Sequence, residues 1–263
     1  MESQYRDLIK SIVEVGEERD QERTGTGTLA LFNTMPMVSD IGKDGIPILT
    51  SKKTFFKGAL RELIWFLSGS TNVGDLHPSI LSWWAPFAKE DGSLGPTYGH
   101  QWRSGHDQLA RTVERLKYSP QSRRHIVSLW DAHTVDQCAL PPCHGLSIQF
   151  YVTNDKRLNV FVHQRSGDMF LGVPINMVSY ALLLSLVSKE CGYSPGILSL
   201  LVVDAHVYNN HIDQTLEMLN NDIIECDRNL VIDDEFSLFN LKEEHVRLEN
   251  YRCHQKIAGS MSV

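Results

Sequence analysis

The longest uncharged stretch of the chain, residues 169–188, limits what the sequence can fold into. Its 20 residues are enough to cross a bilayer as a helix. The stretch also contains a glycine, a proline and an asparagine, and its segment MVSYALLLSLV is apolar on every side. A helix that is apolar all round is typical of the centre of a folded domain. We therefore expect a buried central helix over about 174–191, with Pro174 as its first residue, rather than a membrane span.

The remaining patterns of apolar residues indicate helices and strands without a regular βαβ alternation. Helices are expected at 4–18, 58–68, 107–117 and 209–220, strands at 125–130, 146–152, 158–163 and 197–203, and a glycine-containing loop at 23–28. No linker, repeat or charge block divides the 263 residues, so a single domain over 1–263 is expected. The expected fold class is α+β, with one large mixed β-sheet packed by helices.

Charge and cysteine content narrow the function classes. The net charge is 25 − 32 = −7, and no cluster of Lys and Arg of the kind that grips duplex phosphates is present, so DNA binding is not expected. The five cysteines form no CxxC pair, which argues against a zinc site or a disulfide framework, and no metal is expected. The first residues, MESQYRDLIK, lack an apolar segment. We therefore expect a cytoplasmic protein without a signal peptide.

Cys143 stands in the segment ALPPCHGL, where two prolines restrict the backbone before it and a strand pattern follows. Such a frame presents a side chain rigidly, and a nearby cation would favour the nucleophilic thiolate. A lone cysteine is nevertheless more often a buried structural residue. The other four cysteines lack this frame and are interpreted as structural.

Three arginine-containing segments suggest a site for an anion. Arg165 and Ser166 lie in QRSGD at the expected end of a strand, SRR covers 122–124, and Arg23 begins the glycine loop. A guanidinium group and a hydroxyl together match the geometry of a phosphate. Any one of these arginines could equally be a solvated surface charge, and the sequence alone does not bring them together.

Two further segments carry polar side chains in settings that suggest chemistry. Glu62 lies in the apolar helix pattern ALRELIWFL, where burial would raise its pKa and suit it to proton transfer. An exposed Glu paired with a lysine is an equally good interpretation. His206 and Tyr208 alternate as on a strand and can point the same way, which suits two hydrogen bonds to a sugar hydroxyl. His206 and His211 are five residues apart, which is not the spacing of a helical metal pair.

Taken together, these segments resemble the thymidylate synthase family. The resemblance covers nearly the whole chain and rests on ordered motifs: ERTGTGT, ELIWFLSGSTN, LGPTYGHQWR, SRRHIVSLW, LPPCHGLSIQFYV, QRSGDMFLGVPINMVSYALL, DAHVYNNH and the terminal SMSV. It implies a homodimer joined through the sheets, with dUMP and the co-substrate 5,10-methylenetetrahydrofolate as ligands.

The resemblance also implies residue roles. The implied catalytic residues are Cys143, Glu62, Tyr98, Asn176 and Arg165. The implied nucleotide-binding residues are Arg23, Gln164, Arg165, Ser166, Asp168, Asn176, His206 and Tyr208, with Arg123 and Arg124 completing the site of the partner subunit. The implied folate-binding residues are Lys52, Trp84, Leu140, Asp168, Gly172, Ile175 and Val263.

The implied reaction begins with addition of Cys143 to C6 of the uracil and ends with dTMP and dihydrofolate. Departures from the family pattern fall mostly on the folate side, where this chain has Phe55, Ala85 and Ile175. They leave open a related activity in which water instead of hydride adds to the methylene, giving a 5-hydroxymethyl nucleotide. A third alternative is an inactive regulatory dimer, against which the retained Cys143 and Glu62 argue.

Overall fold

The structure, a computed structural model, describes residues 1–20 and 24–262. Its helices are α1 Glu2–Val15, α2 Ile41–Asp44, α3 Phe56–Ser68, α4 Leu81–Trp84, α5 Gly99–Arg103, α6 Gln108–Tyr118, α7 Gly172–Cys191 and α8 Ile212–Asn220. Its strands are β1 Glu17–Arg19, β2 Thr28–Phe32, β3 Met37–Asp40, β4 Ile126–Ser128, β5 Ser147–Val152, β6 Arg157–Asp168, β7 Ser194–Tyr208, β8 Asn229–Ile232 and β9 Val246–Glu249. The α+β class is confirmed.

A large mixed sheet is the framework of the molecule. Its strands follow the order β1-β2-β7-β6-β5-β4, and β3 pairs with the same edge of β7 as β2 does. Among the strands of the described residues, only β6 and β7 run parallel, and α7 makes the crossover between them, as a parallel pair requires. The C-terminal ends of β6 and β7, which carry polar residues, therefore lie side by side, with Asp168 opposite His206.

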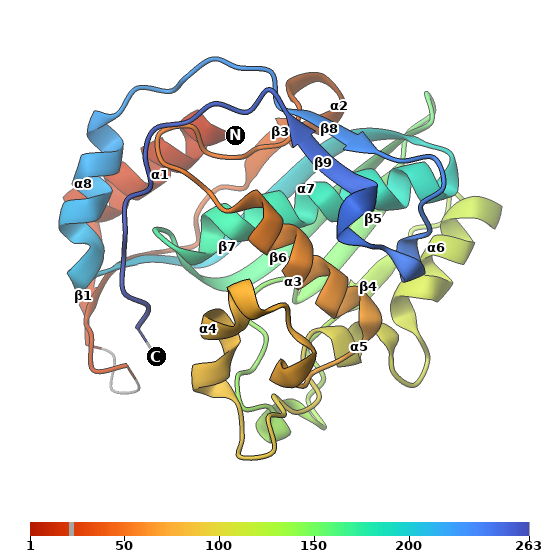
Figure 1. Cartoon of the computed structure of the whole chain (residues 1–263), viewed down its shortest axis with the longest axis horizontal. Helices are drawn as coiled ribbons and strands as arrows, with labels where there is room; N and C mark the ends of the chain where they lie inside the picture. The colour runs from red at the N-terminus through yellow and green to blue at the C-terminus, as the bar shows by residue number, and fades with distance from the viewer. Residues whose placement is uncertain (21–23, 263) are drawn as a thin grey trace.

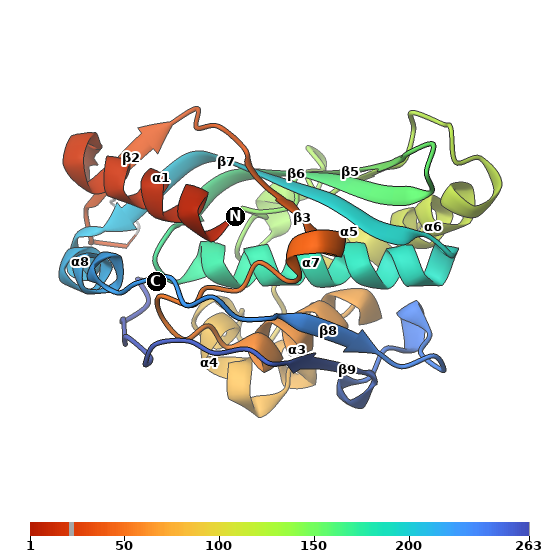
Figure 2. The same ribbon diagram turned by 90° about the horizontal axis from the view of Figure 1, so that it is seen from above.

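Three layers are stacked on one another, as Figure 2 shows: the sheet, then α7, then a layer that contains α3, α4 and the β8–β9 hairpin. Figure 1 shows α7 and α3 in front of the sheet. Because α7 has apolar neighbours on both sides, its sequence needs no polar face. It is long and apolar enough to cross a membrane, yet 83% of its most apolar 18-residue segment is buried inside the fold. The expected buried central helix is confirmed.

Several expected boundaries are wrong. The first helix ends at Val15 instead of residue 18, because Gly16 is extended and 17–19 form β1. The strands expected at 158–163 and 197–203 continue to Asp168 and Tyr208 through segments that contain several polar residues. Pro174 is the third residue of α7 instead of the first. That position is tolerated because the first four N–H groups of a helix have no partner within it.

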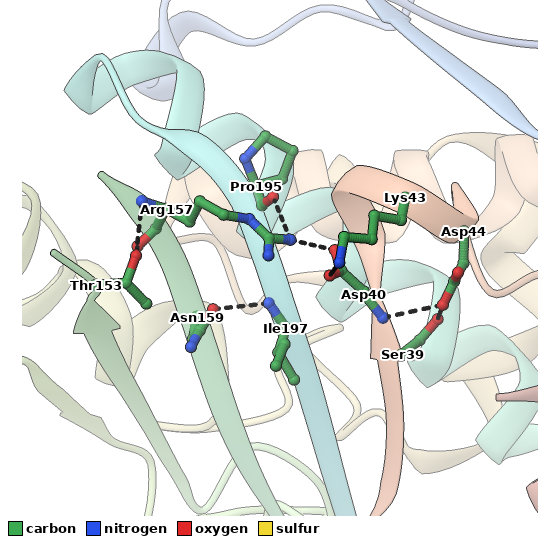
Figure 3. Close-up of polar contacts among 9 residues, drawn as sticks. All are labelled: Ser39, Asp40, Lys43, Asp44, Thr153, Arg157, Asn159, Pro195 and Ile197. Carbon is green, nitrogen blue, oxygen red and sulfur yellow. Dashed lines mark hydrogen bonds and ion pairs between the residues drawn. The ribbon is translucent and has the colours of Figure 1, made fainter. Parts of the chain in front are cut away.

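A polar cluster fixes the corner where β3, β6 and β7 meet, away from the sheet ends discussed below (Figure 3). Arg157 at the start of β6 bonds to the carboxylate of Asp40 and to the carbonyl of Pro195. The β6–β7 register shifts between Leu158 and Val160. There the side-chain Oδ1 of Asn159 accepts the N–H of Ile197 at 2.8 Å, so the irregularity leaves that donor satisfied.

Candidate active site

Cys143 lies in the loop that precedes β5, and the end of β6 and the start of α5 hold it in place. Its carbonyl accepts the N–H of Arg165 at 2.9 Å. Its own N–H donates to the phenol oxygen of Tyr98 at 3.0 Å, and that oxygen lies 3.4 Å from the Cys143 Sγ. Cys143 as a residue is partly exposed, and these hydrogen bonds fix its position.

Opposing influences act on the pKa of the Cys143 thiol. Burial raises it, while the hydrogen bond from Tyr98 and the positive charge of Arg165 lower it, and the net direction is upward. The guanidinium of Arg165 bonds to the carbonyls of Pro142 at 2.9 Å and Pro141 at 3.2 Å, beside the cysteine. The charge of Arg165 favours the thiolate, as expected of a nearby cation, but burial is the larger influence.

Tyr98 adopts a backbone conformation that is rare for a residue with a side chain, with φ 34° and ψ −99°. Such a conformation costs about 1–3 kcal/mol and persists only where the surroundings enforce it. Here the Tyr98 ring stacks on Phe66 at 4.9 Å, and Gly99 packs so tightly against the Phe66 carbonyl that a Cβ would lie 2.8 Å from it. Contact between α3 and α5 therefore sets the direction of the phenol toward Cys143.

Glu62 is a buried acid in the middle of α3, with 5% of its surface exposed. Burial raises its pKa to about 7, against a smaller lowering by the indole N–H of Trp84, which donates to Oε1 at 2.9 Å. A carboxyl group with this pKa can take up or release a proton at neutral pH. The Trp84 ring lies 5.3 Å from that of Tyr98, so Glu62, Trp84, Tyr98 and Cys143 form one connected group.

A second polar group connects α7 to β6. The amide of Asn176 donates from Nδ2 to Gln164 Oε1 at 3.2 Å, and Gln164 Nε2 donates to the Ser166 carbonyl at 3.0 Å. Asn176 and Gln164 are buried. These bonds fix the orientation of the Asn176 amide, as a group that reads the edge of a base requires.

The N-terminal end of α7 gathers the residues expected on the folate side. Asp168 Oδ1 accepts the N–H groups of Phe170 at 2.9 Å and Leu171 at 3.2 Å. Lys52 bonds to the Phe170 carbonyl and lies 3.7 Å from the centre of the Phe170 ring. Burial lowers the pKa of Lys52 to about 8, although the charge of Asp168 opposes this.

Three further residues expected on the folate side, Leu140, Gly172 and Ile175, are each partly exposed. A Cβ built on Gly172 would make an ordinary van der Waals contact with the Asp168 Cβ at 3.8 Å.

The end of β7 carries the residues expected to contact the sugar. His206 and Tyr208 point to the same side of β7, with their rings 5.2 Å apart. His206 Nδ1 lies 3.5 Å from a carboxylate oxygen of Asp204, which in turn lies 3.4 Å from Arg19. The hydrogen bond and charge of His206 lower the pKa of Asp204 despite its burial. The alternation expected from the sequence is confirmed.

The structure does not bring all the arginines together. Arg123 and Arg124 are exposed and precede His125, whose carbonyl pairs with Phe150 in β5. Because β5 pairs with β6, Phe150 lies opposite Val160, next to Asn159. Asn159 and Arg165 are roughly 20 Å apart along the strand, at about 3.3 Å per residue. Neither Arg123 nor Arg124 therefore reaches Arg165 within one subunit.

Arg23 and Val263, both expected at the site, lie outside the described residues. Two surface hollows of about 410 and 290 Å³ lie elsewhere, one beside the β8–β9 hairpin and one beside the N-terminus. In the described residues, no group of three or more His, Cys, Asp or Glu side chains is arranged to hold a metal ion.

The sequence reading missed His144 and its partner. His144 is buried, its Nδ1 lies 2.6 Å from the Tyr180 hydroxyl, and burial lowers the pKa of its imidazole to about 3. Its ring lies 4.7 Å from that of Tyr98. Gly145 has φ 67°, and a Cβ there would collide with the Tyr180 hydroxyl. The pair His144 and Gly145, directly after Cys143, was the sequence signal that could have identified this contact.

One comparison with known proteins bears on this site. A family model described as thymidylate synthase matches residues 3–263 of the chain. The match includes every segment that supplies a described residue of the site.

Proposed function

Because the chain belongs to the thymidylate synthase family, we propose that it converts dUMP to dTMP with 5,10-methylenetetrahydrofolate as co-substrate. Membership of this family supports the assignment of the protein as an enzyme that transfers a one-carbon unit to dUMP. The observation that carries the finer proposal is the connected group of Cys143, Tyr98, Trp84 and Glu62, which combines a nucleophile with a proton carrier of suitable pKa.

In the proposed mechanism, the Cys143 thiol loses its proton and Sγ adds to C6 of the uracil. Negative charge then develops on O4, and the fixed amide of Asn176 stabilises it because it needs no reorientation. Binding of the nucleotide phosphate near Arg165 and Ser166 positions C6 at the sulfur. C5 then attacks the methylene carbon carried by the folate, and loss of the C5 proton breaks the bond between that carbon and the folate nitrogen. Hydride transfer from the resulting tetrahydrofolate to the methylene, with departure of Sγ from C6, gives dTMP, dihydrofolate and the free cysteine. Glu62 relays the protons gained and lost around the ring.

A second candidate function is hydroxymethylation of dUMP, in which water adds instead of hydride. The observation that favours it is the exposure of Ala85 next to Trp84, together with the partly exposed Ile175. Trp84 itself is buried and bonded to Glu62, which favours exclusion of water and therefore the synthase.

Product analysis separates the two candidates. Incubation with dUMP and methylenetetrahydrofolate should give dTMP by mass spectrometry, with dihydrofolate rising in step by absorbance. Cys143→Ser should give neither product and still bind dUMP in calorimetry, because an alcohol ionises far less readily than a thiol. A product of 5-hydroxymethyl-dUMP without dihydrofolate would establish the second candidate instead.

We also propose that the functional unit is a homodimer joined through the open face of the sheet. On that face Ile126, Gln149 and Phe161 form a row across β4, β5 and β6. Ile126 and Phe161 are exposed apolar residues there, and Tyr151 is 63% exposed on the same face. An apolar sheet face of this extent is typical of an interface.

The proposed dimer assigns Arg123 and Arg124 to the phosphate site of the partner subunit. In the described part of the chain, neither guanidinium has a hydrogen-bond or ion-pair partner. Mixing inactive Cys143→Ser and Arg124→Ala chains should restore partial activity, since some mixed dimers contain one intact site. No recovery after demonstrated subunit exchange would contradict the shared site.

A further inference from the structure

The C-terminal tail, residues 256–262, is hydrogen-bonded to the rest of the described protein at one point. Among the described residues, all hydrogen bonds of the tail converge on the carbonyl oxygen of Ser260. His211 Nε2 lies 2.8 Å from that oxygen, and Asn210 Nδ2 lies 3.5 Å from it. Ile257 is the only buried apolar side chain in this segment and anchors its first residues in the core. Beyond Ile257, the contact with His211 holds the tail in place.

His211 is built into the interior next to the candidate active site. Its side chain is fully buried directly after β7, with the ring of Phe170 at 5.1 Å and that of Tyr208 at 6.2 Å. Gly259 fits against the same ring, since a Cβ there would lie 3.0 Å from both His211 Nε2 and Phe170 Cε1. His211 thus touches the sugar-contacting end of β7, the Phe170 turn and the tail.

The hydrogen bond also indicates the form of the imidazole. A carbonyl oxygen only accepts, so Nε2 must carry the hydrogen. Nδ1 is buried and has no partner in the described part of the chain. A hydrogen on Nδ1 would be an unsatisfied buried donor, which is costly. The tautomer with hydrogen on Nε2 suits this position, and the ring then serves as a fixed donor.

We propose that His211 is a positioning residue that holds the C-terminal tail against the site and links its placement to the nucleotide-contacting end of β7. The link to the nucleotide rests on the proposed function, whereas the hold on the tail does not. In both ribbon views the described part of the tail lies at the same end of the molecule as α8, which follows His211 directly (Figures 1 and 2).

The hold on the tail is tested by the rate at which a carboxypeptidase releases Met261 from the folded full-length chain, followed by mass spectrometry. His211→Phe keeps an aromatic ring and removes the donor, so release should be roughly five to ten times faster. His211→Gln should restore part of the slow release, because its amide N–H can donate. The unfolding midpoint of each variant, from circular dichroism, shows whether the fold is retained.

Two tail variants keep the test independent of the fold around His211. Gly259→Ala should release Met261 faster, because the new Cβ pushes the tail off the imidazole. Ser260→Ala is the matched control, and its rate should be unchanged because the contact uses the backbone carbonyl. Equal rates for Gly259→Ala and the unmodified chain, or equally fast release by Ser260→Ala, would overturn the proposal.

Adding dUMP tests the link to the nucleotide site. dUMP should slow the release of Met261 from the unmodified chain and from Ser260→Ala, but not from His211→Phe. The same slowing in His211→Phe would refute the link. Calorimetry measures dUMP binding separately. If the unmodified chain does not bind dUMP, the proposed function fails. The rates of Met261 release measured without dUMP still test the role of His211.

Discussion

Replacing Glu62 by glutamine should make the protein more stable and less active. Glutamine has nearly the same shape, and its oxygen can still accept the indole N–H of Trp84, so packing is preserved. What disappears is the cost of ionising a buried carboxyl group. That cost is read from its pKa, which burial raises from 4.5 to about 7. At about 1.4 kcal/mol per pH unit, the difference amounts to about 3 kcal/mol.

The effect has a defined pH window. Because the pKa of Glu62 is higher in the folded than in the unfolded chain, folding favours the protonated acid. Below pH 4.5 the acid is neutral in both states, so the unmodified chain and Glu62→Gln should have similar stability. Between pH 4.5 and about 7 the unmodified chain should lose stability relative to the variant. Above pH 7 the gap should remain near its full size.

The assay is urea unfolding at matched protein concentrations at pH 4.5, 6 and 8, followed by tryptophan fluorescence and circular dichroism. Turnover of dUMP by Glu62→Gln should fall by about a hundredfold or more, since glutamine cannot relay a proton. Glu90→Gln, at an exposed position, controls for the loss of one negative charge. A free-energy difference between Glu62→Gln and the unmodified chain that does not grow between pH 4.5 and 8 would refute the reasoning.

Three other substitutions test separate features. Tyr98→Phe removes the hydrogen-bond donor that lowers the pKa of Cys143. Iodoacetamide should therefore alkylate the thiol roughly fivefold more slowly at pH 8. An unchanged rate would contradict the assigned hydrogen bond. Asn176→Asp should shift the kcat/KM preference from dUMP towards dCMP by about tenfold or more, and an unchanged ratio in competition assays would remove this residue from base recognition. Gly196→Ala would place a Cβ 2.1 Å from Asn159 Oδ1. Urea unfolding should show a free energy of unfolding lower by about 2–3 kcal/mol. The loss should be smaller when Asn159 is also replaced by alanine.

The sequence predicted the parts of the fold that depend on local patterns. The central helix and the α3 segment are apolar at helical spacing, and their packing against one another explains the burial of Glu62. The short strands β1, β3, β8 and β9 were missed because each has only three or four residues and depends on pairing with a distant segment. Three residues are too few to show a period of two.

The sequence proposes the members of the candidate site, but not their geometry. The motifs named Cys143 and Tyr98, whereas the φ of 34° that aims the phenol comes from packing between helices. Burial outweighs Arg165 in setting the pKa of the thiol, and no motif carries that balance. His144 was overlooked because its importance comes from Tyr180, which lies 36 residues away in the sequence.

The position of α7 between two layers has a consequence for the synthesis of the chain. The α3 helix, which covers part of one side of α7, is made before it, whereas the β8–β9 hairpin and β7, which covers much of the other side, are made after it. A nascent chain therefore presents a long apolar helix to water until β7 has left the ribosome. Chains that stall before residue 194 should be held by chaperones and prone to aggregation, while chains that pass Tyr208 can complete the sheet and escape both fates.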